Sequence, residues 1–92
     1  MSTKAAWFVY MLRCGDGSLY TGIALDVRER LAVHRAGKGA RYTRARLPLR
    51  LVYQERLRGK SAALRREIEI KQLDRSAKLE LIARNRARKA KR

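Results

Sequence analysis

Residues 7–24, WFVYMLRCGDGSLYTGIA, decide the fold of this chain. The run Trp7–Arg13 is rich in aromatic and β-branched side chains, which is typical of a buried strand. It ends at Cys14–Ser18, where two glycines flank an aspartate and favour a tight turn. The run Leu19–Ile23 follows at once and has the composition of a second strand. The stretch therefore predicts an antiparallel β-hairpin.

A helix is expected directly after this hairpin. Asp26 and Glu29 stand three residues apart, which is the spacing of a capping box, so Asp26 marks the predicted helix start. Gly37 is expected to end the helix, because glycine favours the conformation in which helices terminate. Residues 37–46 (GKGARYTRAR) then read as a basic loop.

The second half of the chain predicts one more strand and two helices. Pro48, the only proline, introduces a third strand over Leu49–Glu55, in which apolar and polar residues alternate. Ser61 is expected to cap the next helix, with Leu64 and Ile68 on its inner face. A short break and a last helix follow.

The order ββαβαα predicts an α/β (α+β) domain in which helices flank a three-stranded antiparallel sheet. With 92 residues and 10.6 kDa, the chain is expected to form a single domain over residues 1–83. Residues 84–92 (RNRARKAKR) are expected to be a frayed basic tail.

The composition restricts the possible partners. The chain has 24 Lys and Arg against 8 Asp and Glu, a net charge of +16, which favours binding to polyanions such as nucleic acids. One cysteine and one histidine exclude a disulfide framework and a tetrahedral zinc site. The longest apolar run, Ala5–Leu12, is far shorter than the ~20 residues that cross a bilayer. We therefore expect no membrane partner and a cytoplasmic location.

Five residues have side chains suited to phosphodiester chemistry. Arg30 and His34 stand one turn apart on the first predicted helix and face the same side. Tyr10 and Tyr20 lie on the two strands of the hairpin, and Glu67 lies on the helix after the third strand. Taken singly, the cations also fit a solvated helix face, the tyrosines fit a sheet core, and the glutamate fits an exposed helix. Only the combination is informative.

The two tyrosine-containing triads resemble the signature triads of the GIY-YIG nuclease family. The first is Phe8–Tyr10 (FVY) and the second is Tyr20–Gly22 (YTG). The first has phenylalanine where the family has glycine, the second has threonine where it has isoleucine, and neither position carries chemistry in the family. The resemblance covers about residues 7–82, and residues 37–43 (GKGARYT) are similar to short stand-alone bacterial members.

The resemblance extends to the charged residues of the helices. Arg30 and His34 match an arginine followed one turn later by a histidine or tyrosine, and Glu67 matches the metal-binding glutamate of the family. The resemblance implies one Mg²⁺ or Mn²⁺ ion held by Glu67 and an arginine that neutralises charge on the phosphate. It implies a proton acceptor among Tyr10, Tyr20 and His34, and the sequence does not decide between them.

The basic loop is a further candidate for contact with nucleic acid. Cations beside an aromatic ring suit a segment that follows phosphates and stacks on a base. The candidate binding residues are Lys38, Arg41, Tyr42, Arg44 and Arg46.

The expected function is that of a metal-dependent endonuclease that hydrolyses phosphodiester bonds in DNA, with DNA repair as the expected process. It is expected to be structure-directed or weakly sequence-selective, because no second domain is expected to read a target, and a protein partner could supply targeting. The alternative is a non-catalytic module that binds DNA or RNA and has a degenerate nuclease site. Docking on an acidic protein has only the charge in its favour. The sequence carries no signal of oligomeric state.

Overall fold

A three-stranded antiparallel sheet forms the centre of the protein. The computed structural model describes residues 5–90, and its strands are β1 (Ala6–Arg13), β2 (Leu19–Ala24) and β3 (Arg50–Arg58). The spatial order is β2-β1-β3, so β1 pairs with both neighbours and β3 has a free edge. The predicted hairpin and the predicted antiparallel sheet are confirmed.

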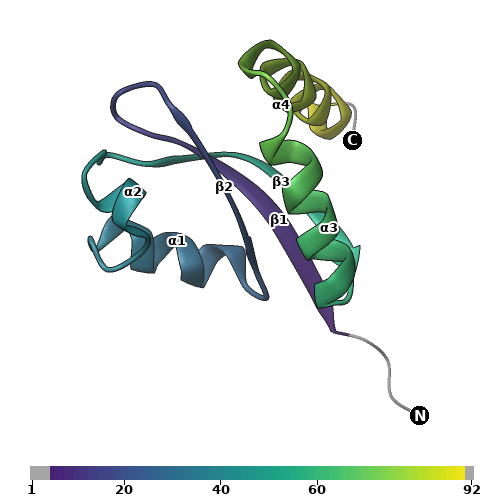
Figure 1. Ribbon diagram of the computed structural model, residues 1–92, viewed down its shortest axis with the longest axis horizontal. Coiled ribbons are helices and arrows are strands. Elements are labelled where there is room, and N and C mark those ends of the chain that lie inside the picture. Colours follow the sequence, from purple (N-terminus) through teal and green to yellow (C-terminus); the bar gives the residue numbers. More distant parts are fainter. Residues whose placement is uncertain (1–4, 91–92) are drawn as a thin grey trace.

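Helices cover both faces of this sheet (Figure 1). The helices α1 (Val27–Arg35) and α2 (Arg41–Arg44) lie on one side, and α3 (Lys60–Lys71) and α4 (Arg75–Ala90) lie on the other. Two apolar clusters result, because successive side chains of β1 point to opposite faces. Val9 and Met11 pack toward α3 and α4, while Tyr10 and Leu12 pack toward α1.

The first helix begins as the sequence predicts. The carboxylate of Asp26 accepts a hydrogen bond from the backbone N–H of Glu29 at 3.0 Å and so satisfies one free amide of the first turn. The predicted order ββαβαα is confirmed with one addition. The short helix α2 forms inside residues 37–46, so the prediction of a loop over that whole segment is wrong.

The inner face of α3 differs from the prediction. Leu64 and Ile68 are 40% and 55% exposed, whereas Ala63 and Ile70 are fully buried. The prediction is wrong because it chose the largest apolar pair. The inner stripe of α3 instead runs from Ala63, whose small side chain lets the sheet approach closely, to Ile70, seven residues later. Arg66 lies half-buried between them.

The ends of the last two helices also differ from the prediction. Gly59, with φ of 92°, precedes α3 and no side chain caps its first turn, so Ser61 is not the cap. The helix α4 continues to Ala90, which places residues 84–90 in a helix rather than in a frayed tail. Residues 91–92 lie outside the described range, and the domain boundary at residue 83 stays a prediction.

A β-bulge breaks the alternation expected along the third strand. Leu51 pairs with Leu12 and Tyr53 pairs with Met11, so Val52 is an extra residue in β3. Leu51 therefore packs with the α1 cluster while Tyr53 packs with the α3 cluster. No helix within residues 5–90 is long and apolar enough to cross a membrane.

Candidate active site

A buried hydrogen bond joins two of the residues selected from the sequence. Tyr10 projects from β1 toward α1, and His34 projects from the last turn of α1 toward the sheet. The Tyr10 hydroxyl and His34 Nε2 are 2.9 Å apart. The His34 side chain is fully buried and Tyr10 is 1% exposed, so this bond is shielded from bulk water.

Thr43 fixes the direction of this hydrogen bond. Its hydroxyl donates to the backbone carbonyl of Ala40 at 2.9 Å, which leaves Thr43 Oγ1 as an acceptor for His34 Nδ1, also at 2.9 Å. His34 therefore carries its proton on Nδ1 when neutral, and its Nε2 lone pair accepts from the Tyr10 hydroxyl. The result is a directed chain from Tyr10 through His34 and Thr43 to a backbone carbonyl.

Burial keeps both partners of this hydrogen bond neutral. It raises the pKa of Tyr10 to about 12, and the Arg30 side chain opposes that rise in part. Burial also lowers the pKa of His34, and the positive charge of Arg30 lowers it further. Near pH 7 the site therefore holds a neutral phenol beside a neutral imidazole.

Two glycines let the backbone approach this pair closely. A Cβ atom at Gly22 would lie 2.6 Å from the Tyr10 hydroxyl oxygen, closer than real Cβ contacts allow. A Cβ atom at Gly39 would overlap the imidazole of His34 at Nδ1. Residues without side chains therefore flank the pair at both ends, one on β2 and one just before α2.

Tyr20 and Arg30 lie beside the Tyr10–His34 pair. The ring of Tyr20 is half-buried, with its centroid 5.3 Å from that of His34 and 6.4 Å from that of Tyr10. Arg30 is exposed on α1 one turn before His34, and its charge acts on the pKa values of both Tyr10 and His34. An exposed guanidinium therefore lies within electrostatic range of a buried proton donor and acceptor.

Glu67 contributes a carboxylate whose charge acts on Tyr10. Its side chain on α3 is 17% exposed, and its charge contributes to the raised pKa of Tyr10. The ammonium group of Lys71 lies 3.2 Å from the Glu67 carboxylate. Tyr10, Tyr20 and His34 thus lie together beside Arg30, and the Glu67 carboxylate on α3 is linked to them through its charge on Tyr10.

The donor set suits a divalent ion that keeps most of its water. Within residues 5–90, no three or more His, Cys, Asp or Glu side chains gather as a metal-binding group. Mg²⁺ is commonly bound through one or two carboxylates together with substrate phosphate and water. The single half-buried carboxylate of Glu67 fits that mode of binding and does not fit an all-protein cage.

Comparison with known families gives the same identification as the triads. The family model for the GIY-YIG catalytic domain matches residues 6–80. The chain belongs to the GIY-YIG family. This family is a nuclease superfamily whose substrates are nucleic acids, so the five residues lie in the catalytic domain of a GIY-YIG protein.

Relatives of the same size share this GIY-YIG domain. A UPF0213 protein from Staphylococcus aureus is 56% identical over 75 residues, which cover 82% of this chain and 92% of the relative. The solution NMR structure of the UPF0213 protein BH0048 from Bacillus halodurans is 46% identical, with a TM-score of 0.56 and coverage of 85% and 83%. The solution NMR structure of EF2693 from E. faecalis is 33% identical, with a TM-score of 0.57 and coverage of 88% of each chain.

The basic segment of this GIY-YIG domain surrounds α2. Lys38, Arg41 and Arg44 are exposed, as a contact with phosphates requires. Arg46 differs, because its guanidinium pairs with Asp16 at 3.1 Å and its Cζ lies 3.8 Å from the ring centroid of Tyr42. Arg46 is therefore already bound to Asp16 and Tyr42, and its guanidinium covers one face of the Tyr42 ring.

Two further residues, Thr43 and Gly39, shape the GIY-YIG site and were not predicted from the sequence. Thr43 bonds to His34, and Gly39 allows the histidine ring to lie against the backbone. Both fall within residues 37–43, which resemble short bacterial members of the family, yet nothing in their residue types indicates a contact with His34. The small pair Gly39–Ala40 is typical of a close approach of the backbone, but it does not indicate which residue approaches.

Proposed function

We propose that the protein is a metal-dependent endonuclease that hydrolyses phosphodiester bonds in DNA, with the Tyr10–His34 pair as the proton acceptor. The single observation that supports this most is the directed hydrogen bond from the Tyr10 hydroxyl to His34 Nε2. A neutral imidazole whose Nε2 lone pair can take the proton of Tyr10 is the form that a general base needs near neutral pH. A purely binding surface has no use for such a buried pair.

In the proposed reaction, a water molecule attacks the phosphorus and its proton passes to the oxygen of Tyr10. The Tyr10 proton moves at the same time to His34 Nε2, which becomes an imidazolium that keeps its Nδ1 bond to Thr43. Tyr10 is almost fully buried, so the water approaches from the side of the half-buried Tyr20, whose hydroxyl orients it. General-base assistance of this kind contributes typically 10²–10⁴-fold in rate.

Arg30 supplies the charge that the phosphate needs in the transition state. Its exposed guanidinium can donate two parallel hydrogen bonds to the nonbridging oxygens, where negative charge develops. Glu67 would hold a Mg²⁺ or Mn²⁺ ion, which polarises the phosphate and assists the leaving oxygen when bound. Lys38, Arg41 and Arg44 would contact the flanking phosphates, with sequence-independent and salt-dependent affinity.

The test is a cleavage assay on supercoiled plasmid and on flapped and branched DNA, with Mg²⁺ or Mn²⁺. Wild type is compared with Glu67→Ala and with Lys71→Ala, which changes the other member of the ion pair and keeps the carboxylate. We expect cuts by wild type and Lys71→Ala, none by Glu67→Ala, and equal DNA affinity of all three at low salt without metal. Equal cutting by Glu67→Ala contradicts the assigned metal ligand. Binding without cutting by wild type on every substrate favours the non-catalytic module.

A further inference from the structure

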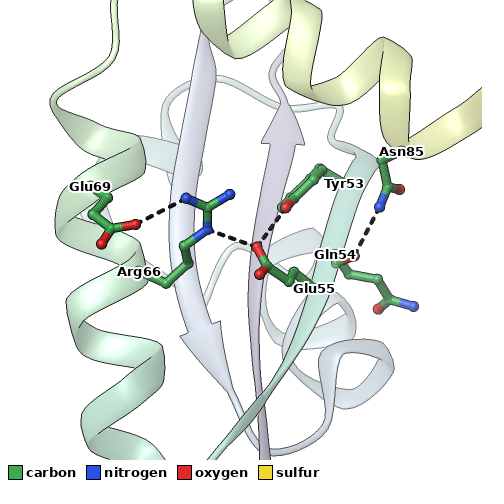
Figure 2. A network of polar contacts seen from close by, with 6 residues as sticks. All are labelled: Tyr53, Gln54, Glu55, Arg66, Glu69 and Asn85. Atoms are coloured by element: carbon green, nitrogen blue, oxygen red, sulfur yellow. Dashed lines mark hydrogen bonds and ion pairs between the residues drawn. The ribbon is translucent and has the colours of Figure 1, made fainter.

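Two basic depressions adjoin each other where α4 packs on β3, and together they form what we call the α4–β3 groove. Ile82 anchors α4 in the apolar cluster, and the side-chain amide of Asn85 donates to the backbone carbonyl of Gln54 at 3.4 Å (Figure 2). Depressions lie on both flanks of α4 and share Tyr53, Gln54, Asn85 and Lys89 in their linings. None of the five catalytic candidates lines either one.

Cations occupy both walls of this groove. Six Arg and Lys side chains line the two depressions and are exposed, and within residues 5–90 none of the six forms an ion pair. In one depression, Arg13 of β1 and Arg50 of β3 lie opposite Arg86 and Lys89 of α4. In the other, Arg56 of β3 lies opposite Arg88 and Lys89 of α4. A cleft with one sign of charge on both walls concentrates positive potential, so the groove attracts an extended polyanion.

The one acidic residue in the groove is already neutralised (Figure 2). Arg66 donates to the Glu55 carboxylate at 2.8 Å, and the Tyr53 hydroxyl donates to the same oxygen at 2.6 Å. Burial opposes ionisation of Glu55, but these two hydrogen bonds outweigh it and lower its pKa. A second carboxylate, Glu69, bonds to Arg66 at 3.0 Å. Glu55 therefore already has cationic partners in Arg66 and, through its charge, Arg88, and no other acidic residue lines the two depressions within residues 5–90.

We propose that the α4–β3 groove is a second nucleic-acid-binding surface that holds a sugar-phosphate backbone outside the cleavage site. The proposal rests on the proposed function for the identity of its ligand. Arg86 and Lys89 are one turn apart on α4, about 5–6 Å between Cβ atoms, and they line the same depression as Arg50 of β3 and Arg13 of β1. Such closely spaced cations on two walls match the regular charges of a nucleic-acid strand.

The test compares two triple variants that remove the same charge. The groove variant is Arg86→Ala, Arg88→Ala and Lys89→Ala. The control replaces three exposed arginines that do not line the groove, Arg65, Arg75 and Arg84, with alanine. Alanine is the best helix former, so α3 and α4 stay folded in both variants, and circular dichroism verifies this.

Binding of a 20-bp duplex is measured in EDTA at several salt concentrations. Each phosphate contact contributes about −0.9 to the slope of log affinity against log salt, so three lost contacts flatten the slope by about 2.7. We expect nearly that change in the groove variant and less than about 1 in the control, since scattered cations contact few phosphates. In amide NMR spectra, titration with the duplex should move Gln54 to Arg56 and Asn85 to Lys89.

Equal slope changes in both variants would overturn the proposal, because they would reflect net charge alone. An unchanged slope in the groove variant would also overturn the proposal. If that variant in addition loses binding to polyglutamate, the ligand of the groove is an acidic protein. Metal-dependent cleavage by wild type is measured separately. If wild type cuts but the groove variant binds as wild type does, only the groove proposal fails. If wild type never cuts but the slopes differ as expected, only the proposed function fails.

Discussion

Replacing Thr43 with valine tests whether the tautomer of His34 controls cleavage. Valine has nearly the shape of threonine, so the substitution removes the hydroxyl and leaves the packing of this fully buried residue intact. His34 Nδ1–H then loses its acceptor at 2.9 Å. A buried N–H donor without a partner costs about 1–3 kcal/mol. The equilibrium between the two neutral tautomers of His34 should therefore shift toward the one that carries the proton on Nε2.

The same free energy sets the expected loss of activity. A change of 1–3 kcal/mol shifts the ratio of the two tautomers by roughly 5–150-fold. The Nε2–H tautomer cannot accept a proton from Tyr10, so we expect kcat to fall by about 10–100-fold with little change in DNA affinity. The melting temperature should fall by roughly 4–8 °C for each kcal/mol lost.

Three measurements separate this positioning role from a loss of stability. Thr43→Ser keeps the hydroxyl and should restore most of the cleavage rate. The ¹⁵N chemical shifts of the His34 ring report the tautomer directly, and they should change in Thr43→Val but not in Thr43→Ser. Full cleavage by Thr43→Val, or an Nδ1–H tautomer that persists in it, would refute the reasoning.

The remaining predictions concern pH, close packing and helix capping. Because the pKa of His34 is lowered, the cleavage rate should fall as the pH falls, with a midpoint below pH 6.5. At such pH the histidine of the unfolded chain binds a proton that native His34 does not, so the free energy of unfolding should fall over the same range. Midpoints at or above pH 6.5 would contradict both expectations. Gly39→Ala should displace His34 and so lower both the melting temperature and the cleavage rate. A Cβ atom at Gly37 would meet no atom within 4 Å, but φ of Gly37 is 76°, so Gly37→Ala should lower the melting temperature and leave the cleavage rate unchanged. Asp26→Ala should lower the free energy of unfolding by about 1 kcal/mol in urea titrations, and Asp26→Asn by much less; equal losses would argue against a capping role.

The parts of the fold that follow from local chemistry were predictable from the sequence. The hairpin depends on a turn segment between two β-rich runs, and the start of α1 depends on Asp26 three residues before an amide that it binds. The phase of α3 was not predictable in the same way. Its inner stripe contains Arg66 and Glu67, whose burial depends on partners elsewhere in space, so apolar residues alone selected the wrong face.

The candidate site shows the same division. The order of two tyrosines, an arginine, a histidine and a glutamate matches a family pattern, and in the structure both tyrosine rings lie close to the histidine ring. Spacing alone left Arg30 and His34 as two cations on one helix face, yet one is exposed and the other is fully buried. Thr43 was missed because its role exists only after α1 and α2 pack together and bring its hydroxyl to the imidazole.

The pKa values of the central pair bear on how a proton can leave the attacking water. A resting phenolate–imidazolium pair would require Tyr10 to give up a proton at a pKa of about 12 to a histidine whose pKa lies below 6.5. That gap exceeds about 5 pKa units, or about 7 kcal/mol before the attraction between the two charges is counted. Tyr10 therefore rests as a neutral phenol near pH 7. In the proposed reaction, we therefore expect the proton to leave Tyr10 during the attack on phosphorus, with Arg30 bound to the phosphate, so that no free phenolate forms first.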